Sequence, residues 1–564
     1  MKQQELDQPV RNGQPLEAVD GQTMKRLFEA AAASLEADAE TINALNVFPV
    51  PDGDTGTNMV LTMRSALEAV ADYAGQHAGE VVARVAQGAL MGARGNSGVI
   101  LSQLFRGLAR SLEGKERVSA RDLAEAFQLA VEMAYKAVMK PVEGTILTVA
   151  REAAEAARQA VAENADIVSL FDRTVAAAKQ ALERTPDLLP VLKEAGVVDS
   201  GGRGLVAVLE GMWRYLRGEP VELVTPEEEK MRAVLEAPPE PLADGRYGYD
   251  IQFLIRGENL DVEAIREYIS RLGDCALVIG DERLVKVHVH CLNPGPALEY
   301  GANLGMLDDI VVENMDLQYQ EFREQQAAAA QEVPPANEKS VPTEELTGVG
   351  TVAVVLGEGM KRVFESLGVS RVVTGGQTMN PSTQDILEAI EAVKAKAVIV
   401  LPNNKNVIMA AEQASKLASK PVYIVPTRTM PQGIAALMAF NFTADVETNV
   451  KSMTRAAEHV VTGEVTTAVR TTRVGDVEVR EGDIIGVLDG ELVATGPDLL
   501  SVIRDMLSRL DLSKYELCTL FYGADVRPEE AEALSQALRE AFPSLEFEVV
   551  EGGQPHYYYV FSVE

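Results

Sequence analysis

Two carboxylates one residue apart stand in a stiff turn near the start of the chain. The segment from Asn46 to Met59 has the sequence NVFPVPDGDTGTNM, so Asp52 and Asp54 flank a glycine and follow two prolines. An apolar helical pattern begins at Met59. Two carboxylates held by a rigid loop at a helix start suit Mg²⁺, which binds a few carboxylate oxygens and keeps its other positions for water and phosphate. The alternative interpretation is an Asp-Gly-Asp turn that only caps a helix, a common use of this composition.

Three further loops of small and polar residues each precede a helical pattern. They are residues 92–98 (GARGNSG), 140–145 (KPVEGT) and 199–204 (DSGGRG). A helix N-terminus presents free backbone N–H groups and the positive end of the helix dipole, so it attracts phosphate. If the helices of this region run antiparallel, several of these N-termini converge at one end of a bundle. The loops together indicate a nucleotide site, although each alone is explained equally well as a helix cap. The sequence contains no Walker A motif and no glycine-rich kinase loop.

The chain resembles a known kinase family in these loops. Residues 43–59, 93–98 and 199–202 are similar to the motifs of the DhaL (DAK2) nucleotide-binding domain, and more closely to those of the ATP-binding subunit of bacterial fatty acid kinase, the FakA type. The resemblance covers nearly the whole chain, including its three-part layout. It implies an antiparallel helical barrel that binds Mg-ATP at one end.

The resemblance also implies roles for residues of these loops. Asp52 and Asp54 would be the catalytic carboxylates that hold Mg²⁺, with two ions expected. Asn46 would be a neutral third ligand, where dihydroxyacetone-kinase relatives have an aspartate. The further residues expected to bind ATP are Thr55, Thr57, Asn58, Asn96, Ser97, Gly98, Thr145, Asp199, Ser200, Gly201 and Gly202. For Ser97 and Thr145 a helix cap is the alternative role, and Arg203 is expected to pair with a surface carboxylate rather than with phosphate.

Composition excludes several classes of function. The 564 residues carry a formal net charge of −33, which argues against nucleic-acid binding and against resting on anionic lipid. Three cysteines do not make a disulfide framework, so a reducing, cytoplasmic location is predicted. No run of about twenty apolar residues exists, so no membrane insertion is expected. Residues 1–16 are predicted to be a flexible N-terminus without the apolar core of a signal peptide.

Residues 17–222 carry Ala-rich amphipathic patterns and are predicted to be helical throughout, as an all-α DhaL-like kinase domain. The helices are expected at 24–45, 81–91, 99–112, 123–139, 146–162, 169–182 and 205–216.

Residues 235–322 follow the order β-α-β-β-α-β, which predicts a ferredoxin-like α+β middle domain. Strands are expected at 251–255, 276–279, 284–291 and 310–312, with helices at 262–272 and 296–304.

A pair of histidines marks this middle domain. His288 and His290 stand two apart on a predicted strand and therefore share one face, where two imidazoles can chelate Zn²⁺ with a third ligand. An exposed strand with two titrating histidines is the alternative, and the commoner case. In the resembling family a cysteine completes this metal set, and here Asp250 stands in its place. Because Asp is a harder ligand than a thiolate, the identity of the metal stays open.

Residues 323–347, with a run of Gln and Ala followed by Pro and Glu, are predicted to be a linker. Residues 348–564 alternate short apolar strands with helices, which is typical of an α/β domain. The resemblance implies a DegV/EDD-like domain that interacts with a carrier protein. Polar loops at 375–383, 402–406 and 427–431 follow strands, and such loops form ligand crevices in α/β folds. The resemblance makes them a docking or regulatory face, and loop capping is the alternative.

In the second half of this domain, strands are expected at 465–471, 484–488, 517–522, 547–550 and 557–563, with helices at 497–510 and 528–542.

With the resemblance, the sequence predicts the kinase subunit of a two-component fatty acid kinase. It would transfer the γ-phosphoryl group of ATP to the carboxylate of a fatty acid presented by a separate DegV-type carrier protein. The product would be acyl phosphate for phospholipid synthesis, and the kinase would form a homodimer. A carboxylate is already ionised at neutral pH, so the site needs no general base; phosphoryl transfer requires mainly positioning and charge neutralisation. A small-polyol kinase of the dihydroxyacetone type and a non-catalytic nucleotide-sensing scaffold are the alternatives.

Overall fold

The structure is a computed structural model that describes residues 15–46, 53–138, 140–219, 249–280, 282–314, 348–376, 380–468, 472–474, 477–480 and 482–564. The chain forms two compact units. One contains residues 1–222 together with 345–564, and the other contains residues 223–344. Asp52, residues 1–14 of the expected N-terminal segment 1–16 and the expected linker 323–347 lie outside the described residues.

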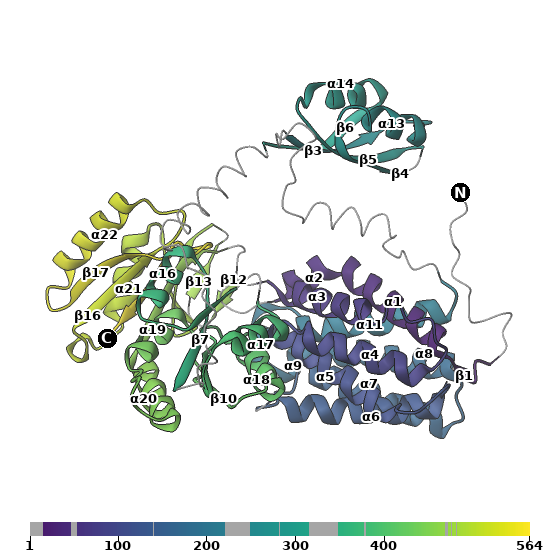
Figure 1. The fold of residues 1–564 in the computed structure, drawn as a ribbon, viewed down its shortest axis with the longest axis horizontal. Helices are drawn as coiled ribbons and strands as arrows, with labels where there is room; N and C mark the ends of the chain where they lie inside the picture. Colours follow the sequence, from purple (N-terminus) through teal and green to yellow (C-terminus); the bar gives the residue numbers. More distant parts are fainter. Residues whose placement is uncertain are drawn as a thin grey trace, which may run out of the picture. The chain divides into compact units, whose positions relative to one another are not determined.

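The N-terminal part of the first unit consists of helices packed side by side (Figure 1), whose contacts close into a ring. Neighbouring helices pack around it in the order α1, α3, α4, α5, α6, α7, α8, α11 and back to α1. The helices are α1 (Gly21–Ala37), α2 (Ala39–Leu45), α3 (Thr55–Glu68), α4 (Ala78–Met91), α5 (Gly95–Ser111), α6 (Ala120–Ala137), α7 (Ile146–Ala162), α8 (Ile167–Glu183), α9 (Thr185–Leu188), α10 (Pro190–Ala195) and α11 (Ser200–Leu216). The predicted helical barrel is confirmed.

Small apolar residues let these helices pack closely. Ala30 and Ala31 of α1 are fully buried, as is Ala134 of α6. Larger side chains fill the space between, with the Phe28 and Phe105 rings edge to face at 5.4 Å between centroids. Ala has the highest helix propensity and occupies little volume, so one residue type supplies both the helical backbone and the narrow interfaces.

Local predictions in this domain were wrong in three places. The single helix expected at 24–45 is two helices, because the chain breaks at Asp38, whose N–H bonds to the Leu35 carbonyl. The stretch expected to be helical throughout also contains two short strands, β1 (Ala18–Val19) and β2 (Val118–Ser119), which pair antiparallel. The short helices α9 and α10 were not predicted; Pro186 and Pro190 lie in their first turns, where proline is tolerated.

The middle unit has the predicted ferredoxin-like arrangement. Its elements are β3 (Tyr249–Arg256), α13 (Val262–Ile269), β4 (Asp274–Gly280), β5 (Leu284–Cys291), α14 (Gly295–Leu304) and β6 (Met306–Asn314). All neighbouring strands are antiparallel, in the order β4-β5-β3-β6. Val285, Val287 and Val289 alternate into a core with Ile251 and Phe253, which is the period-two pattern of a half-buried strand.

The C-terminal part of the first unit opens with a parallel sheet of order β10-β9-β7-β8. Its elements are β7 (Val349–Val355), α16 (Glu358–Ser366), β8 (Arg371–Thr374), α17 (Thr383–Ala392), β9 (Ala397–Leu401), α18 (Ile408–Leu417), β10 (Val422–Ile424), α19 (Met430–Met438) and α20 (Val446–His459). The strand β9 is buried along its whole length, as expected for a central parallel strand with helices on both faces.

A second sheet of mixed direction follows, in the order β15-β14-β11-β18-β16-β17. Its elements are β11 (Val461–Thr467), β14 (Ile484–Leu488), β15 (Glu491–Gly496), α21 (Leu499–Ser508), η1 (Leu512–Lys514), β16 (Leu517–Tyr522), α22 (Pro528–Ala541), β17 (Glu546–Glu551) and β18 (Tyr557–Val563). The strand expected at 465–471 begins four residues earlier, at Val461. The strand β15 and the hairpin of β12 (Thr472–Val474) and β13 (Val477–Val479) were not predicted.

Among the described residues, no helix is both long enough and apolar enough to cross a lipid bilayer.

Candidate nucleotide and metal site

The starts of three helices that follow the predicted loops meet at one end of the helical ring. Ser97, in the first turn of α5, donates its hydroxyl to the carbonyl oxygen of Thr55 at 3.4 Å. Ser200, at the start of α11, donates its hydroxyl to the Thr55 hydroxyl at 3.3 Å. The N-termini of α3, α5 and α11 therefore converge. Helix N-termini favour phosphate through their free N–H groups and the positive ends of their dipoles.

Asp54 is a buried carboxylate at this point of convergence. It occupies the N-cap position of α3, yet its side chain does not cap that helix. Only 5% of its surface is exposed. Its Oδ2 accepts a hydrogen bond of 2.5 Å from the side-chain amide of Asn380, a residue 326 positions later in the chain. A buried carboxylate is costly unless a partner balances its charge, and a bound cation is one such partner.

The first turn of α3 is held by Asn43 of α2. The Asn43 Oδ1 accepts hydrogen bonds from the N–H groups of Gly56 at 2.7 Å and Thr57 at 3.2 Å. The Asn43 Nδ2 donates to the Thr57 hydroxyl at 3.0 Å. Thr57, expected to contact phosphate, thus has both its amide and its hydroxyl engaged by Asn43, which acts as the cap in place of Asp54.

The loop before α5 lies directly on α3. Gly95 has φ +57°, and a Cβ there would stand 2.5 Å from Nδ2 of the buried Asn58. A Cβ on Gly98 would stand 2.3 Å from the Thr62 hydroxyl. Glycine permits both this backbone conformation and this close approach. The Asn96 Nδ2 donates to the Asn406 Oδ1 at 3.1 Å, while the buried Asn96 Oδ1 has no hydrogen-bond partner.

Asp199 caps α11 beside this cluster. Its Oδ2 accepts from the N–H of Gly202 at 2.7 Å, and its own N–H donates to the Thr185 hydroxyl at 3.1 Å. Burial raises the pKa of Asp199 to about 6, against the lowering effect of hydrogen bonds from the Gly202 and Ile146 backbone. Both Gly201 and Gly202 are buried, and the Cβ position of Gly201 lies 3.3 Å from the Ile146 Cβ, so the start of α7 is close by.

Arg203 turns away from this cluster, as predicted. Its Nε lies 2.6 Å from an Asp38 oxygen and its Nη1 lies 3.4 Å from a Glu210 oxygen.

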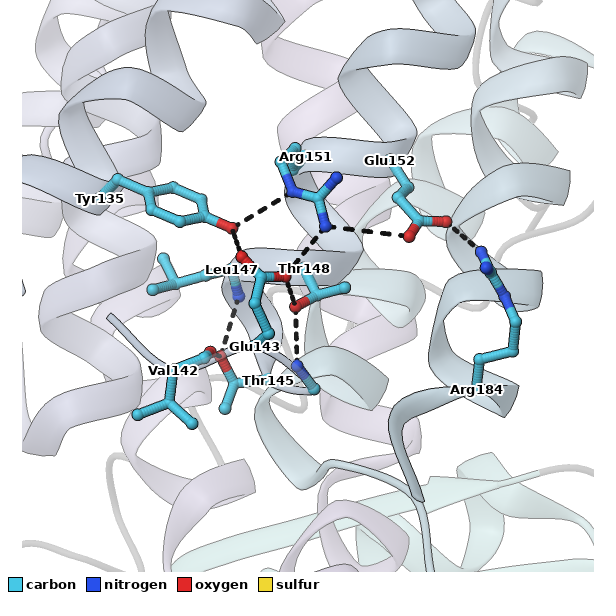
Figure 2. A network of polar contacts seen from close by, with 10 residues as sticks. Tyr135, Val142, Glu143, Thr145, Leu147, Thr148, Arg151, Glu152 and Arg184 are labelled. Atoms are coloured by element: carbon cyan, nitrogen blue, oxygen red, sulfur yellow. Dashed lines mark hydrogen bonds and ion pairs between the residues drawn. The ribbon is translucent and has the colours of Figure 1, made fainter. Parts of the chain in front are cut away.

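In the fourth loop, before α7, the polar side chains form hydrogen bonds within the loop and with the first turns of α7 (Figure 2). The Thr145 hydroxyl donates to the Val142 carbonyl at 2.8 Å and accepts from the Leu147 N–H at 3.4 Å, so Thr145 is the helix cap of the alternative interpretation. The Glu143 carboxylate accepts from the Thr148 hydroxyl at 2.7 Å and from Arg151 at 2.9 Å.

The remaining expected metal ligands of the helical domain are incompletely described. Asn46 is partly buried, and its N–H bonds to the Asn43 carbonyl at 3.1 Å. No group of three or more His, Cys, Asp or Glu side chains that could hold a metal occurs among the described residues, a set that omits Asp52. The donors that are described still suit Mg²⁺, because the Asp54 carboxylate and the unpartnered amide oxygen of Asn96 are hard oxygen donors.

The expected zinc ligands lie on neighbouring strands. In the register of β3 and β5, Asp250 pairs with His290, and Gln252 pairs with His288. The side chains of the three expected ligands lie outside what the structure describes, so zinc binding stays a prediction. Cys291 is buried in the core, its thiol donates to the Asn293 carbonyl at 3.1 Å, and burial raises its pKa.

Two asparagines of the site were missed from the sequence. Asn43 lies inside the motif but was not assigned a role, and an Asn shortly before a predicted helix start is a recognisable cap signal. Asn380 lies in the loop 375–383, which was expected to form a docking face. No local pattern relates it to Asp54.

Comparison with known proteins defines the class. Residues 49–214 match the DAK2 domain, so the helical ring and its converging loops form a DAK2-type kinase domain. Residues 246–322 match the middle domain of FakA-like fatty acid kinase proteins, and residues 350–564 match the C-terminal domain of the same proteins. Protein YloV of Bacillus subtilis is 42% identical, over 97% of this chain and 100% of its own length. The chain therefore belongs to the FakA-like family of fatty acid kinase proteins.

Solved structures of other proteins also match parts of this chain. The DegV family protein Cg2579 of Corynebacterium glutamicum is 16% identical with a TM-score of 0.31, over 38% of this chain and 96% of its own. The dihydroxyacetone kinase of C. freundii in complex with AMP-PNP and Mg²⁺ is 19% identical with a TM-score of 0.28, over 38% of this chain and 36% of its own.

Proposed function

We propose that this chain is the kinase component of a two-component fatty acid kinase. It transfers the γ-phosphoryl group of ATP to the carboxylate of a fatty acid held by a separate DegV-type carrier protein. The observation that carries the proposal is the buried Asp54 carboxylate where the N-termini of α3, α5 and α11 meet. It lies within the DAK2 domain of a FakA-like chain.

The proposal gives each group of this cluster a task. Asp54 and Asp52 hold Mg²⁺, with Asn46 as the neutral third ligand, and the ions neutralise charge on the phosphates. Ser97, Gly98 and the start of α5 contact phosphate, since the hydroxyl of Ser97 makes only a long bond of 3.4 Å and is available to a better acceptor. The start of α11, with Ser200, Gly201 and Gly202, borders the nucleotide. Asp199 holds that turn in place.

The chemistry needs no proton transfer to begin. An oxygen of the ionised fatty acid carboxylate attacks the γ-phosphorus, the bond from that phosphorus to the leaving oxygen of ADP breaks, and the products are acyl phosphate and ADP. Positioning and charge neutralisation are the protein's contributions. Burial of Asp54 keeps bulk water from this carboxylate, which strengthens its interaction with a cation.

The remaining parts of the proposal concern context. The chain works as a cytoplasmic homodimer, its acyl phosphate product enters phospholipid synthesis, and its C-terminal DegV-like domain contributes to carrier docking. The middle domain holds Zn²⁺ through His288, His290 and Asp250. Metal analysis of the purified chain tests this last point, with the double variant His288→Ala, His290→Ala as the control that must lose the zinc.

The central experiment measures acyl phosphate from oleate, trapped with hydroxylamine, with Mg-ATP and with or without a DegV-type carrier from the same cell. Turnover only with the carrier is the expected result. The variants Asp52→Asn and Asp54→Asn keep the size of the side chain but weaken the proposed binding of Mg²⁺. Because the ion then neutralises less of the negative charge of the transition state, we expect turnover to fall by about a hundredfold or more.

Other results would redirect the assignment. Carrier-independent phosphorylation of dihydroxyacetone would favour the small-polyol kinase. ATP binding without turnover of either substrate would favour the nucleotide-sensing scaffold. Full oleate turnover by Asp54→Asn would show that the site is placed wrongly.

A further inference from the structure

The C-terminal domain supplies a buried amide to the candidate site of the helical domain. The Asn380 side chain is fully buried, and its Nδ2 donates to the Asp54 Oδ2 at 2.5 Å. The orientation of this amide follows from the contact. Exchanging its nitrogen and oxygen would place a carbonyl oxygen against a carboxylate oxygen, which is repulsive while Asp54 is ionised.

The other atom of the same amide is unused. The Asn380 Oδ1 is buried and has no hydrogen-bond partner, and the Asn96 Oδ1 is in the same state. Buried acceptors without partners are rare, because each loses its bonds to water without replacement. Hydrated Mg²⁺ keeps several of its waters when it binds carboxylates, and those waters are donors that need acceptors. The unpartnered oxygen beside Asp54 fits that need.

Asn380 and the residues that follow it contact the helical domain. The Thr383 N–H donates to the Ala93 carbonyl at 3.1 Å, and Arg94 pairs with Ser382 as an isolated β-bridge. The Arg94 guanidinium donates to the Asn380 carbonyl at 2.8 Å and lies 3.5 Å from the Asp385 carboxylate.

Apolar side chains extend this contact. Ala93 and Val99, from the loop and first turns of α5, belong to one hydrophobic cluster with Ile386 and Ile390 of α17 and Ala411 of α18. The contact between the two domains is therefore a shared core, and Asn380 is held in a defined place relative to Asp54.

We propose that Asn380 is a positioning residue of the phosphoryl-transfer site, so that the C-terminal domain completes the metal site of the helical domain. Its Nδ2 orients the Asp54 carboxylate, and its Oδ1 accepts a hydrogen bond from a metal-bound water. The inference rests on the proposed function, because it takes Asp54 to be a Mg²⁺ ligand. Hydrogen-bonded partners of metal ligands commonly set ligand orientation and metal affinity in this way.

Nucleotide binding as a function of Mg²⁺ concentration tests the inference without carrier or fatty acid. The full-length chain is titrated with a fluorescent ATP analogue at a series of Mg²⁺ concentrations. For Asn380→Ala, the Mg²⁺ concentration that gives half-maximal binding is expected to rise by about 10- to 100-fold. Binding in EDTA is expected to match that of the natural chain, since the amide acts through the metal site.

The matched control is Asp385→Asn, which weakens the ion pair to Arg94 in the same contact without touching Asp54. A purely structural role of the loop would shift both variants in thermal stability and neither in Mg²⁺ dependence. If Asn380→Ala does not fold, Asn380→Ser provides the same comparison with a smaller cavity and a polar side chain in place.

Each other outcome has a defined meaning. Unchanged Mg²⁺ dependence in Asn380→Ala, with the natural chain binding Mg-ATP, would overturn this inference and leave the proposed function standing. Tighter binding or faster turnover in the variant would overturn it as well, since the amide would then be an inhibitory contact. Failure of the natural chain to bind Mg-ATP would instead refute the proposed function.

Discussion

The start of α7 and the starts of α3 and α5 have similar composition but differ in hydrogen bonding among the described residues. The side chains of the α7 loop bond to one another, with Thr145 as the cap and Glu143 bonded to Thr148 and Arg151 (Figure 2), while the Ile146 backbone N–H bonds to the Asp199 carboxylate. At the start of α3 and α5, Asp54 is buried without capping its helix, and the Asn96 carbonyl oxygen is buried without a partner. The unpartnered Asn96 oxygen therefore calls for an explanation that the bonded side chains of the α7 loop do not, and a bound ligand is the explanation that we propose.

This difference could not be read from composition. Gly, Ser, Thr and Asp serve both as caps and as phosphate ligands, because both tasks use the same N–H groups at helix starts. The distinguishing feature is whether a local acceptor already occupies those groups, and that depends on which other segments reach the loop.

Among substitutions in these loops, the largest expected effect on ATP affinity comes from filling the contact between the α5 loop and α3. Gly95→Ala places a Cβ 2.5 Å from the Asn58 amide at a backbone φ of +57°. We expect ATP affinity to fall by more than about tenfold, because Asn58 and the loop must move apart. Calorimetric titration with Mg-ATP measures this.

The control for this substitution is Gly114→Ala, where φ is +73° and nothing lies within 4 Å of the added Cβ. Strain alone, about 1–2 kcal/mol, should reduce its stability, with ATP affinity unchanged. Equal ATP affinities in the two variants would show that the α5 loop is not part of the nucleotide site.

The second prediction uses the raised pKa of Asp199. Because this pKa moves from 3.8 to about 6 on folding, the folded state binds the proton more tightly than the unfolded state. Stability is therefore lost as the pH rises from about 4 to about 6. Asp199→Asn removes the charge, so its stability relative to the natural chain should rise across this window, by at most about 3 kcal/mol. Urea unfolding at a series of pH values measures the difference.

Asp166→Asn is a control of opposite sign. Asp166 also caps a helix, accepting from the Ser169 N–H at 3.0 Å. Burial acts to raise its pKa, but hydrogen bonds from Ser169 and the Leu16 backbone outweigh burial and lower it. The stability from this lowering is present above the unfolded pKa and is lost on acidification, so the variant should lose stability at neutral pH. If the unfolding free energies of both variants changed in the same direction relative to the natural chain as the pH rises, the opposite pKa shifts of Asp199 and Asp166 would be contradicted.

A third prediction compares the two hydroxyls whose roles were ambiguous. Thr145→Ala should reduce the unfolding free energy by about 0.5–2 kcal/mol through loss of the cap, with ATP affinity unchanged. Ser97→Ala removes only a long hydrogen bond of 3.4 Å, so its stability should change little while ATP affinity falls. Thermal denaturation and nucleotide titration of both variants measure these effects. A loss of ATP affinity in Thr145→Ala together with a loss of stability alone in Ser97→Ala would contradict the prediction.

The smallest effect is expected in the self-contained network. Hydrogen bonding from Thr148, with added contributions from Arg151 and Tyr135, lowers the pKa of Glu143 against the effect of burial. Its stabilisation is therefore present above the unfolded pKa and is lost on acidification. The carboxylate and Arg151 are about half exposed, so Glu143→Gln should cost less than about 1 kcal/mol at neutral pH. A change in ATP affinity would show that this loop does reach the nucleotide.

Periodicity predicted most of the architecture from the sequence. The helix at Ile146–Ala162 and the strands at Ile484–Leu488, Leu517–Tyr522 and Tyr557–Val563 lie where expected, because burial of one face imposes a regular spacing on the residues. Elements without a long apolar face, such as β1, β2 and the short helices after α8, gave too little signal. Breaks such as Asp38 were missed because a single polar residue does not interrupt the pattern.

From the sequence, residue spacing indicated an all-α N-terminal domain and the positions of its helix starts, and the resemblance to the kinase family implied the helical barrel. Spacing of this kind is local, so a single segment carries it alone. Which polar groups at the helix starts already have partners, and which distant residue meets Asp54, depended on the packing of segments far apart in the chain. The contact between Asp54 and Asn380 joins residues 326 positions apart, and such a contact depends on the packing of two domains rather than on any pattern that either segment contains.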